Sequence, residues 1–358
     1  MKEAFQLDQI TVSGSFTEMG QQQGEAFRAR IQAFMAVRFD AVEGYCSDRG
    51  FATTRLKEIA HQSMAIFQDW DRDGFDEHLG IAQGAQVDAV DLYLATNMTD
   101  MRDALILEAP AAADHEGCSS ILVPASMTRD GVAIAGQTWD LNPPDIEYIV
   151  AVKRRPEYGP STWTVTCAGC LTLMGINQTG LSVGTTNIKT RGSRPGVGYL
   201  SVLHRLIRTH SVREAASILK NAPRAGAHVY WLADPVELRE YETSPDRIVR
   251  REAGKGPLCH TNHCLDTVHQ TLEGEASSDS SRCRLDRLET LLDRDDHTLE
   301  TIQAIFADRH DGVLSINRYA EDDQGTATNA VFVAFPAHRE AHACRGPADR
   351  GAWTVLGF

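Results

Sequence analysis

The sequence predicts an α+β protein, because helical and β-rich patterns occupy different parts of the chain. Before Cys118, apolar residues recur at helical spacing, as at Phe27, Ile31 and Phe34. After Cys118, short β-rich runs dominate, and a helical block interrupts them before strands return. Strands, then helices, then strands again favour helices stacked outside an antiparallel double sheet. Periodicity by itself predicts only mixed α and β structure.

The individual elements follow from the same patterns. Upstream helices are expected at Glu18 to Val42, Thr54 to Trp70, and Val87 to Leu107, the last entered through Asp88. Downstream, the first strands are expected at Ser119 to Val123, Val132 to Gly136, Ile146 to Lys153, Thr162 to Thr166, Leu171 to Ile176 and Leu181 to Thr185. A helical block spans Gly198 to Lys220, with a capping box at Ser211 to Glu214. Later strands are expected at His228 to Leu232, Leu238 to Glu242, Ala330 to Ala334 and Trp353 to Leu356, and later helices at Ser281 to Asp293 and Leu299 to Arg309.

Composition limits the classes of function. The chain has 358 residues, enough for a sizeable core, and a formal net charge of -14. That charge argues against nucleic acid as a partner and weighs mildly against a coenzyme A thioester as substrate. No stretch approaches the roughly 20 apolar residues that a membrane span needs, and residues 1–14 lack the apolar core of a secretion signal. We therefore expect a cytoplasmic protein without a membrane partner.

The most informative segment is His115-Glu116-Gly117-Cys118-Ser119-Ser120, between the loop-like stretch Glu108 to Asp114 and an apolar run. At a Gly-Cys step in such a place a chain can cut itself. The thiol of Cys118 attacks the carbonyl of Gly117, the upstream chain moves onto sulfur, and water releases it. Glycine suits the upstream position because it tolerates the unusual backbone geometry of the attack.

Cleavage would give Cys118 a free α-amine beside its own thiol. The reference pKa of an α-amine, about 8, makes it a well-matched base at neutral pH. A nucleophile that carries its own base on the same residue is a recognised catalytic arrangement. A buried structural cysteine is the plain alternative for Cys118 taken alone.

Further segments occur in a set order along the chain. They are Gly14-Ser15-Phe16-Thr17-Glu18-Met19-Gly20 with Gln23-Gly24, Gly84-Ala85-Gln86-Val87-Asp88, Gly136-Gln137-Thr138-Trp139-Asp140, His260-Thr261-Asn262-His263-Cys264-Leu265, and Ser315-Ile316-Asn317-Arg318-Tyr319. With these segments the chain resembles, over nearly its whole length, the isopenicillin-N acyltransferase family of self-processing N-terminal-nucleophile (Ntn) hydrolases. The resemblance implies a four-layer αββα sandwich preceded by a mainly helical N-terminal segment. It also implies two chains from one precursor, residues 1–117 and 118–358, that stay together as a heterodimer.

The resemblance also implies roles for particular residues. Asn262 matches the asparagine that looks like the family's oxyanion donor, and an amide donates without carrying a titratable charge. Asp140 matches the aspartate expected to hold the α-ammonium, with a loop-capping aspartate as the alternative. Arg318 matches an arginine that would bind Asp140 or a substrate carboxylate, or form a structural salt bridge. Asn187 is a second candidate for the oxyanion or substrate contact.

Two functions fit this site. The first is an amidohydrolase that cleaves a small N-acyl or aminoacyl amide through a thioester, and the second is an acyltransferase that passes the acyl group to a small amine. Neither needs a cofactor or a metal. The chain departs from the family at Asn97-Met98-Thr99-Asp100, where relatives often show an arginine and a glutamate, and at Ser119-Ser120, which replaces a threonine pair.

A zinc-stabilised binding protein is the alternative outside this chemistry. Cys167-x-x-Cys170 together with Cys259-His260-x-x-His263-Cys264 offers more ligands than a tetrahedral zinc site needs. Small buried thiols are the simpler interpretation of Cys167 and Cys170. His260 and His263 invite comparison with cysteine proteases, but an N-terminal cysteine does not require a histidine, and a hydrogen-bonded core position is the expectation for both.

Overall fold

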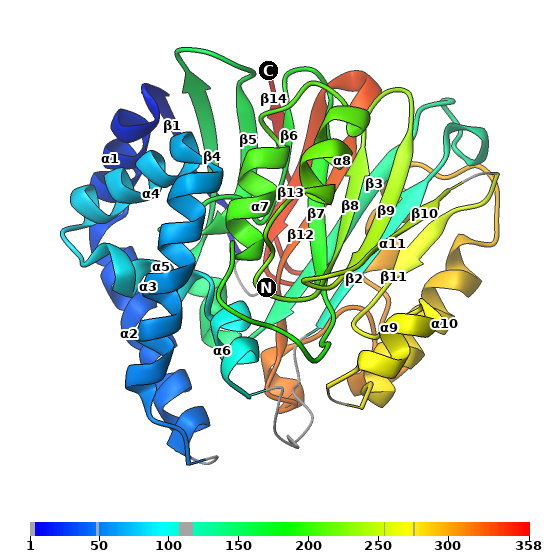
Figure 1. The fold of residues 1–358 in the computed structure, drawn as a ribbon. Helices are drawn as coiled ribbons and strands as arrows, with labels where there is room; N and C mark the ends of the chain where they lie inside the picture. The colour runs from blue at the N-terminus through cyan, green and yellow to red at the C-terminus, as the bar shows by residue number, and fades with distance from the viewer. Residues whose placement is uncertain (1–3, 48–49, 107–116, 254, 275) are drawn as a thin grey trace.

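Two β-sheets face one another at the centre of the molecule (Figure 1). The computed structural model describes residues 4–47, 50–106, 117–253, 255–274 and 276–358, so the expected loop at Glu108 to Asp114 and the motif residues His115 and Glu116 lie outside it. The larger sheet runs in the order β1 (Asp8–Gly14), β4 (Ile149–Pro156), β5 (Thr162–Cys167), β6 (Met174–Asn177), β7 (Ser182–Asn187), β8 (His228–Ala233), β9 (Leu238–Thr243) and β10 (Ile248–Glu252). The smaller sheet runs in the order β11 (Leu258–His260), β2 (Gly117–Val123), β3 (Ile134–Leu141), β12 (Ala327–Phe335), β13 (Glu340–Arg345) and β14 (Thr354–Gly357).

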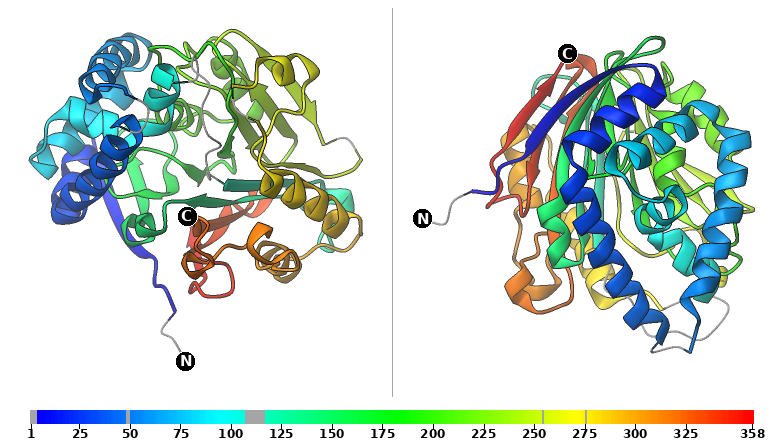
Figure 2. Two further views of the ribbon diagram at one scale, coloured as in Figure 1. Left: turned by 90° about the horizontal axis from the view of Figure 1, so that it is seen from below. Right: turned by 90° about the vertical axis from the view of Figure 1, so that its left-hand side faces the viewer.

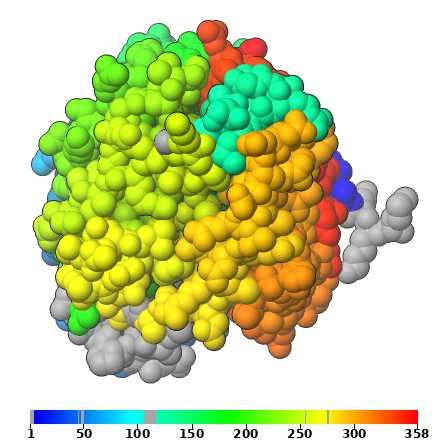
Figure 3. All heavy atoms as spheres, turned by 90° about the vertical axis from the view of Figure 1, so that its right-hand side faces the viewer, coloured from blue at the N-terminus to red at the C-terminus, as the bar shows by residue number. Residues whose placement is uncertain are grey.

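Helices cover the outer face of each sheet. On the larger sheet these are α7 (Tyr199–Leu206) and α8 (Val212–Lys220). On the smaller sheet, α10 (Asp279–Leu292) and α11 (Leu299–Phe306) bury Leu288, Ile302 and Phe306 against strand residues such as Ile121 and Val333. The layers are therefore helix, sheet, sheet, helix, and the expected αββα architecture is confirmed. Figure 3 shows yellow and orange segments, α9 (Thr267–Leu272), α10 and α11 among them, forming much of one side of the molecule.

The described part of the segment before Gly117 is mainly helical, as expected, and packs at one side of the sheets (Figure 2). Its helices are α1 (Phe16–Ala26), α2 (Arg28–Ser47), α3 (Thr53–Trp70), α4 (Arg72–Ala85), α5 (Ala89–Thr96) and α6 (Met98–Ile106). It also supplies β1, which pairs in parallel with β4. Apolar side chains of this segment and of both sheets form one continuous core. Within the described residues, no helix is both long enough and apolar enough to cross a membrane.

Two of the segments that carry the family resemblance meet at the crossing of α1 and α4. Gly20 and Gly24 lie on α1, and Gly80 and Gly84 lie on α4. A Cβ atom at any of the four would stand 2.1 to 2.3 Å from a backbone oxygen of the facing chain. The two helices can approach this closely only because these positions lack side chains. These glycines are therefore explained by helix packing and not by chemistry.

Element by element, the structure confirms most of the expected order and corrects several boundaries. The helix expected at Glu18 to Val42 is two helices that break at Phe27, and the one at Val87 to Leu107 breaks at Asn97. Asp88 is an N-cap, as expected, and accepts hydrogen bonds from two backbone N–H groups of α5. The strand expected at Val132 to Gly136 begins at Ile134 and continues to Leu141, because its polar residues pair with β2 and β12 inside the sheet.

Candidate active site

Cys118 is the second residue of β2, an inner strand with β11 on one side and β3 on the other. Cys118 pairs with Trp139, and Gly117 pairs with Asp140. Cys118 and Trp139 belong to the core between the two sheets, whereas Ile121 belongs to the core beneath α10 and α11. Since side chains alternate along a strand, the thiol faces the larger sheet and position 117 faces α10. The thiol and the Asp140 side chain thus lie on opposite faces of the smaller sheet.

Asn262 lies directly beside the backbone of Cys118. Its Oδ1 accepts a hydrogen bond from the backbone N–H of Cys118 at 2.8 Å, and its Nδ2 donates to the carbonyl of Asn187 at 3.0 Å. These partners fix which end of the amide is oxygen, because an N–H must meet Oδ1 and a carbonyl must meet Nδ2. The structure therefore brings Asn262, from the loop after β11, together with Cys118. The second hydrogen of Nδ2 is the one that an oxyanion role would use.

Asp140 and Arg318 form a buried pair next to Gly117. Arg318 Nε stands 3.9 Å from Asp140 Oδ2, and neither side chain is more than 6% exposed. Arg318 is held in place because its Nη1 donates to Thr326 Oγ1 at 2.6 Å, its backbone N–H donates to Thr328, and its Nη2 donates to Ser280. Of the two partners considered for Arg318 from the sequence, the structure places Asp140 beside it.

Burial dominates the titration of Asp140. It raises the pKa of the carboxyl, although Arg318 and Arg284 act in the opposite direction. Oδ1 of Asp140 is buried and accepts no hydrogen bond from the part of the chain that the structure describes. A buried carboxylate oxygen without a donor is costly, so this atom has room for one more hydrogen-bond donor.

Arg284 is a site residue that the sequence analysis missed. It lies on α10 with no exposed surface, where Nη1 donates to the carbonyl of Cys118 and to Ser119 Oγ at 2.9 Å, and Nη2 donates to Asn262 Oδ1 at 2.8 Å. Burial, reinforced by the nearby Arg318, lowers the pKa of Arg284 to about 9. A signal did exist in the sequence. Arg284 falls on the apolar stripe of the predicted helix with Leu288 and Leu292, where a charged residue needs a specific partner.

A small cavity of about 20 Å³, enough for about one water molecule, borders the thiol of Cys118. One part of its wall is apolar and comes from Trp139, Leu141 and Leu173. The other part is polar and includes Asn187, the second oxyanion candidate, at the end of β7. The structure therefore places Asn187 at the same cavity as Cys118.

The loop His260–Cys264 is anchored by the buried carboxylate of Glu242. Glu242 Oε1 accepts from His269 Nδ1 at 2.9 Å, and Oε2 accepts from the backbone N–H of Leu265 at 2.8 Å and lies 3.4 Å from His260 Nε2. Burial alone would raise the pKa of Glu242, but the hydrogen bonds from His260 and His269 outweigh it and lower the pKa far below its usual value. His260 thus holds the loop that presents Asn262.

His263 also has a structural environment. Its Nδ1 is 2.8 Å from Ser281 Oγ, and burial together with neighbouring positive charge lowers its pKa to about 4. An imidazole with this pKa is neutral at pH 7. Neither His260 nor His263 lines the cavity at Cys118.

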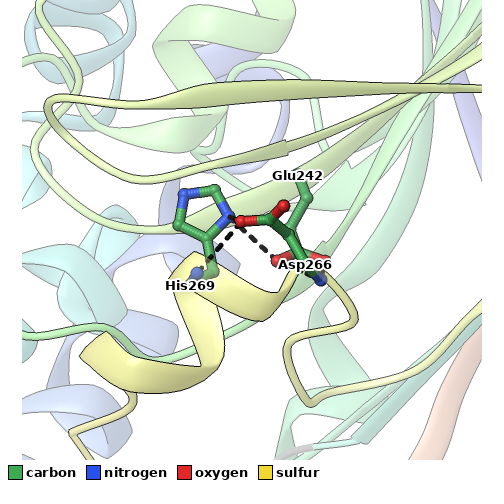
Figure 4. A group of neighbouring side chains, drawn as sticks. All are labelled: Glu242, Asp266 and His269. Atoms are coloured by element: carbon green, nitrogen blue, oxygen red, sulfur yellow. Dashed lines mark hydrogen bonds and ion pairs between the residues drawn. The ribbon is translucent and has the colours of Figure 1, made fainter.

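The residues considered for zinc are not brought together. Cys167 is the last residue of β5 in the larger sheet, Cys259 lies on the smaller sheet beneath α10, and Cys264 belongs to a third apolar cluster. Among the described residues, the group whose ligand atoms converge is Glu242, Asp266 and His269 (Figure 4). Its carboxylates already accept hydrogen bonds, since Asp266 caps α9 and Glu242 holds the loop. This triad is explained by its structural role.

A family model described as acyl-coenzyme A:6-aminopenicillanic acid acyl-transferase matches residues 126–349, more than half of the chain. The acyl-coenzyme A:6-aminopenicillanic-acid-acyltransferase 40 kDa form of Emericella nidulans is 24% identical over 329 residues, which cover 91% of this chain and 88% of that protein. Two solved structures show a looser likeness. Penicillin V acylase from Agrobacterium tumefaciens has a TM-score of 0.44 at 12% identity, over 67% of this chain and 86% of that one. A mutant of conjugated bile acid hydrolase from Clostridium perfringens has a TM-score of 0.47 at 12% identity, over 67% and 92%.

Proposed function

Because the chain belongs to the acyl-coenzyme A:6-aminopenicillanic acid acyl-transferase family, we propose that it is a self-processing amidohydrolase with Cys118 as its nucleophile. Its substrate is a small N-acyl or aminoacyl amide, cleaved through a thioester. The observation that carries the proposal is the hydrogen bond from the backbone nitrogen of Cys118 to Asn262, in a buried array whose thiol side opens into a cavity. The nitrogen that cleavage would release is already held in place.

Maturation proceeds by an N-to-S acyl shift. Cys118 Sγ attacks the carbonyl carbon of Gly117, the C–S bond forms, the C–N bond breaks, and the thiol proton ends on the nitrogen. Water then hydrolyses the thioester and leaves a carboxylate on Gly117 and a free thiol on Cys118. Gly117 suits this step because a Cβ there would stand 3.0 Å from both Arg318 Nη1 and Asp140 Oδ2.

Turnover repeats the same chemistry on a substrate. The α-amine of Cys118 takes the thiol proton as sulfur attacks the substrate carbonyl, and it later delivers that proton to the leaving nitrogen. Water then attacks the thioester, and the acid product leaves. The second Nδ2 hydrogen of Asn262, with Asn187 as a further candidate, stabilises the negative oxygen that forms in each step.

Asp140 and Arg318 would act on the new chain terminus. Asp140 lies opposite Gly117, and its Oδ1 can accept a hydrogen bond from the α-ammonium once the peptide is cut. The positive charge of Arg318 favours the carboxylate form of Asp140 and opposes part of the rise in pKa that burial causes. Asp140 is therefore a positioning residue for the amine.

Residues 1–117 and 118–358 would remain one particle after the cut. The upstream segment contributes strand β1 to the larger sheet and shares a continuous core with both sheets, which supports a stable heterodimer. A cytoplasmic location belongs to the same proposal and is favoured by a chain whose eight cysteines form no disulfide in the structure.

An acyltransferase is the second candidate, favoured by the activity for which the family and the Emericella nidulans relative are named. The two activities share the thioester and differ in what resolves it. A burst of acyl-enzyme, followed with and without an added small amine, separates them. Amide product that rises with amine concentration indicates transfer, and acid product that does not change indicates hydrolysis.

Denaturing mass spectrometry of the purified protein tests the proposal. We expect two fragments, one of 117 residues that ends at Gly117 and one of the remaining 241 that begins at Cys118. Cys118→Ala should leave one intact chain and abolish turnover. Cys259→Ala is the matched control, because Cys259 is a buried thiol on the adjacent strand β11 whose pKa burial raises to about 12. Full activity in a protein that stays uncut would refute the mechanism.

A further inference from the structure

A second buried polar pair, His228 and Asp100, reaches the cavity at Cys118 through His228 and has no part in the proposed mechanism. His228, the first residue of β8, lines the cavity and pairs across the strands with Asn187. Its Nε2 lies 2.7 Å from Oδ1 of Asp100, and both side chains are at most 2% exposed. Its Nδ1 is buried and has no hydrogen-bond partner within the described residues.

Neighbouring groups hold this pair firmly. The ring of His228 stacks on the ring of Tyr199 with centroids 4.6 Å apart, and the backbone N–H of Tyr199 donates to Asp100 Oδ2 at 2.7 Å. A Cβ at Gly226 would stand 2.3 Å from Asp100 Oδ1, so the carboxylate occupies a space that only glycine leaves open. The pair is therefore fixed in orientation by packing as well as by hydrogen bonds.

The hydrogen-bond pattern determines what Nδ1 offers. A carboxylate only accepts, so the hydrogen between the two groups belongs to Nε2. The neutral form of His228 with this hydrogen presents a lone pair at Nδ1. The cationic form would leave a charged N–H buried without an acceptor, which costs more than an unused lone pair. Nδ1 therefore accepts, and its ligand must donate.

Charge narrows the ligand further. With His228 neutral, the pair retains the negative charge of Asp100, whose two partners are an imidazole N–H and a backbone N–H. Asp100 does not line the cavity itself, but only the imidazole of His228 separates its buried negative charge from the wall, so this charge favours a cationic group in the cavity over a neutral one. A protonated amine supplies both the hydrogen and the charge.

We infer that His228 and Asp100 form a subsite that binds an ammonium group of the substrate beside the scissile amide. The inference rests on the proposed function and narrows its substrate class to small amides that carry a protonated amine. It also gives the segment before Gly117 a direct part in recognition, because Asp100 lies on α6 and Thr99 of the same helix lines the cavity.

Paired substrates test the inference. One pair differs in the acyl group, phenylglycine p-nitroanilide against phenylacetyl p-nitroanilide, and the other in the leaving amine, the phenylacetyl amides of ethylenediamine and of propylamine. We expect the mature enzyme to prefer the ammonium member of at least one pair by about 30-fold or more in kcat/KM. Asp100→Asn and His228→Gln should bring that ratio close to one. His210→Gln, at an exposed histidine, should keep it.

Each outcome bears on one claim. A mature enzyme that prefers the ammonium member of neither pair overturns the subsite whether or not the variants fold, and so does a preference that Asp100→Asn and His228→Gln both retain. Cleavage at Gly117 shows that a variant has folded. If the wild-type chain is not cut, or none of the four substrates acylates Cys118, the proposed function itself has failed.

Discussion

The backbone nitrogen of Cys118 donates its hydrogen to Oδ1 of Asn262 at 2.8 Å, across 144 positions of sequence. The oxygen end of this amide faces the nitrogen that the proposed cleavage would convert into an α-amine, and its nitrogen end faces the carbonyl of Asn187. Arg284 donates to the same oxygen and so holds the amide from a third side. In the proposed mechanism the two ends of this side chain have separable tasks, because Oδ1 orients the amine and Nδ2 donates to the oxyanion.

Asn262→Asp and Asn262→Ala should separate those tasks. Asp keeps an acceptor for the nitrogen but removes the NH2 donor, so we expect kcat to fall about 100- to 1,000-fold while cleavage still occurs. Ala removes both ends and should also slow cleavage. Single-turnover kinetics and mass spectrometry measure the two effects. Asn221→Asp, at an exposed position, is the control. Equal cleavage and turnover in Asn262→Asp and wild type would exclude the donor role.

Arg284→Met should impair both stability and maturation. The change removes three donors from buried acceptors at Cys118, Ser119 and Asn262. Losing donors to buried acceptors costs about 1–3 kcal/mol each, so we expect a urea midpoint clearly below that of wild type and cleavage slowed at least about tenfold. The urea midpoint and the cleavage rate of Arg284→Lys should lie between those of Arg284→Met and wild type. Arg282→Met, on the exposed side of the same helix, should behave as wild type, and a similar loss there would contradict a specific role for Arg284.

Gly117→Ala should slow self-cleavage without unfolding the protein. The new methyl group would press against the Asp140–Arg318 pair, with 3.0 Å to an atom of each, so one of these side chains must shift. We expect the uncut chain to persist, with a self-cleavage rate at least about tenfold below that of wild type. A small displacement of Asp140 or Arg318 is enough for this, because the contribution of a catalytic group to the rate depends steeply on its position. A time course on denaturing gels measures it. Gly256→Ala is the control, since a Cβ there meets open space. Cleavage of Gly117→Ala at the normal rate would show that the pair plays no part in maturation.

His78 should make the protein less stable in mild acid. It is buried on α4, donates from Nε2 to the carbonyl of Ala89 at 2.8 Å, and burial lowers its pKa to about 4 from the usual 6.5. Above pH 6.5 the imidazole of His78 is neutral in both the folded and the unfolded chain. Between pH 6.5 and 4 the imidazole of His78 binds a proton in the unfolded chain but stays neutral in the folded chain. The free energy of unfolding therefore falls by up to about 3 kcal/mol as the pH is lowered through this range.

Urea unfolding at pH 7 and pH 4.5 checks this prediction. The loss between the two values should shrink in His78→Gln relative to wild type. It should be unchanged in His61→Gln, at an exposed histidine of α3. The same loss in all three proteins would mean that another group controls the acid sensitivity.

The sequence predicted the elements that depend on short-range patterns, such as apolar spacing and helix capping. The helix α3 and the N-cap Asp88 follow from apolar spacing and capping chemistry, and both are present. The helix α4 was not predicted, because it meets α1 through backbone at glycines, which weakens the apolar stripe that periodicity would recognise. Strand β1 was also missed, because it forms only by parallel pairing with β4, more than a hundred residues away in the sequence.

The site shows the same division. Cys118, Asp140, Asn262 and Arg318 lie in short motifs, and the structure brings them together around Gly117 and Cys118. Arg284 and His228 lie outside those motifs, and each acquires its partners only through folding. Arg284 reaches Cys118 across 166 positions, and His228 reaches Asp100 across 128. A sequence without an alignment does not reveal such pairs, although a charged residue on an apolar helix stripe is a useful warning.

Helix α6 borders the cavity and precedes Gly117 in the sequence, whereas Cys118, which carries the proposed reacting sulfur, follows Gly117. In the proposed mechanism, part of the substrate selectivity, that of Asp100, is thus encoded in a different stretch of the gene from the nucleophile, and that stretch can change while Cys118 stays constant. A mutant library confined to Met98–Ile106 is therefore the natural starting point for evolving new specificities on an unchanged catalytic apparatus.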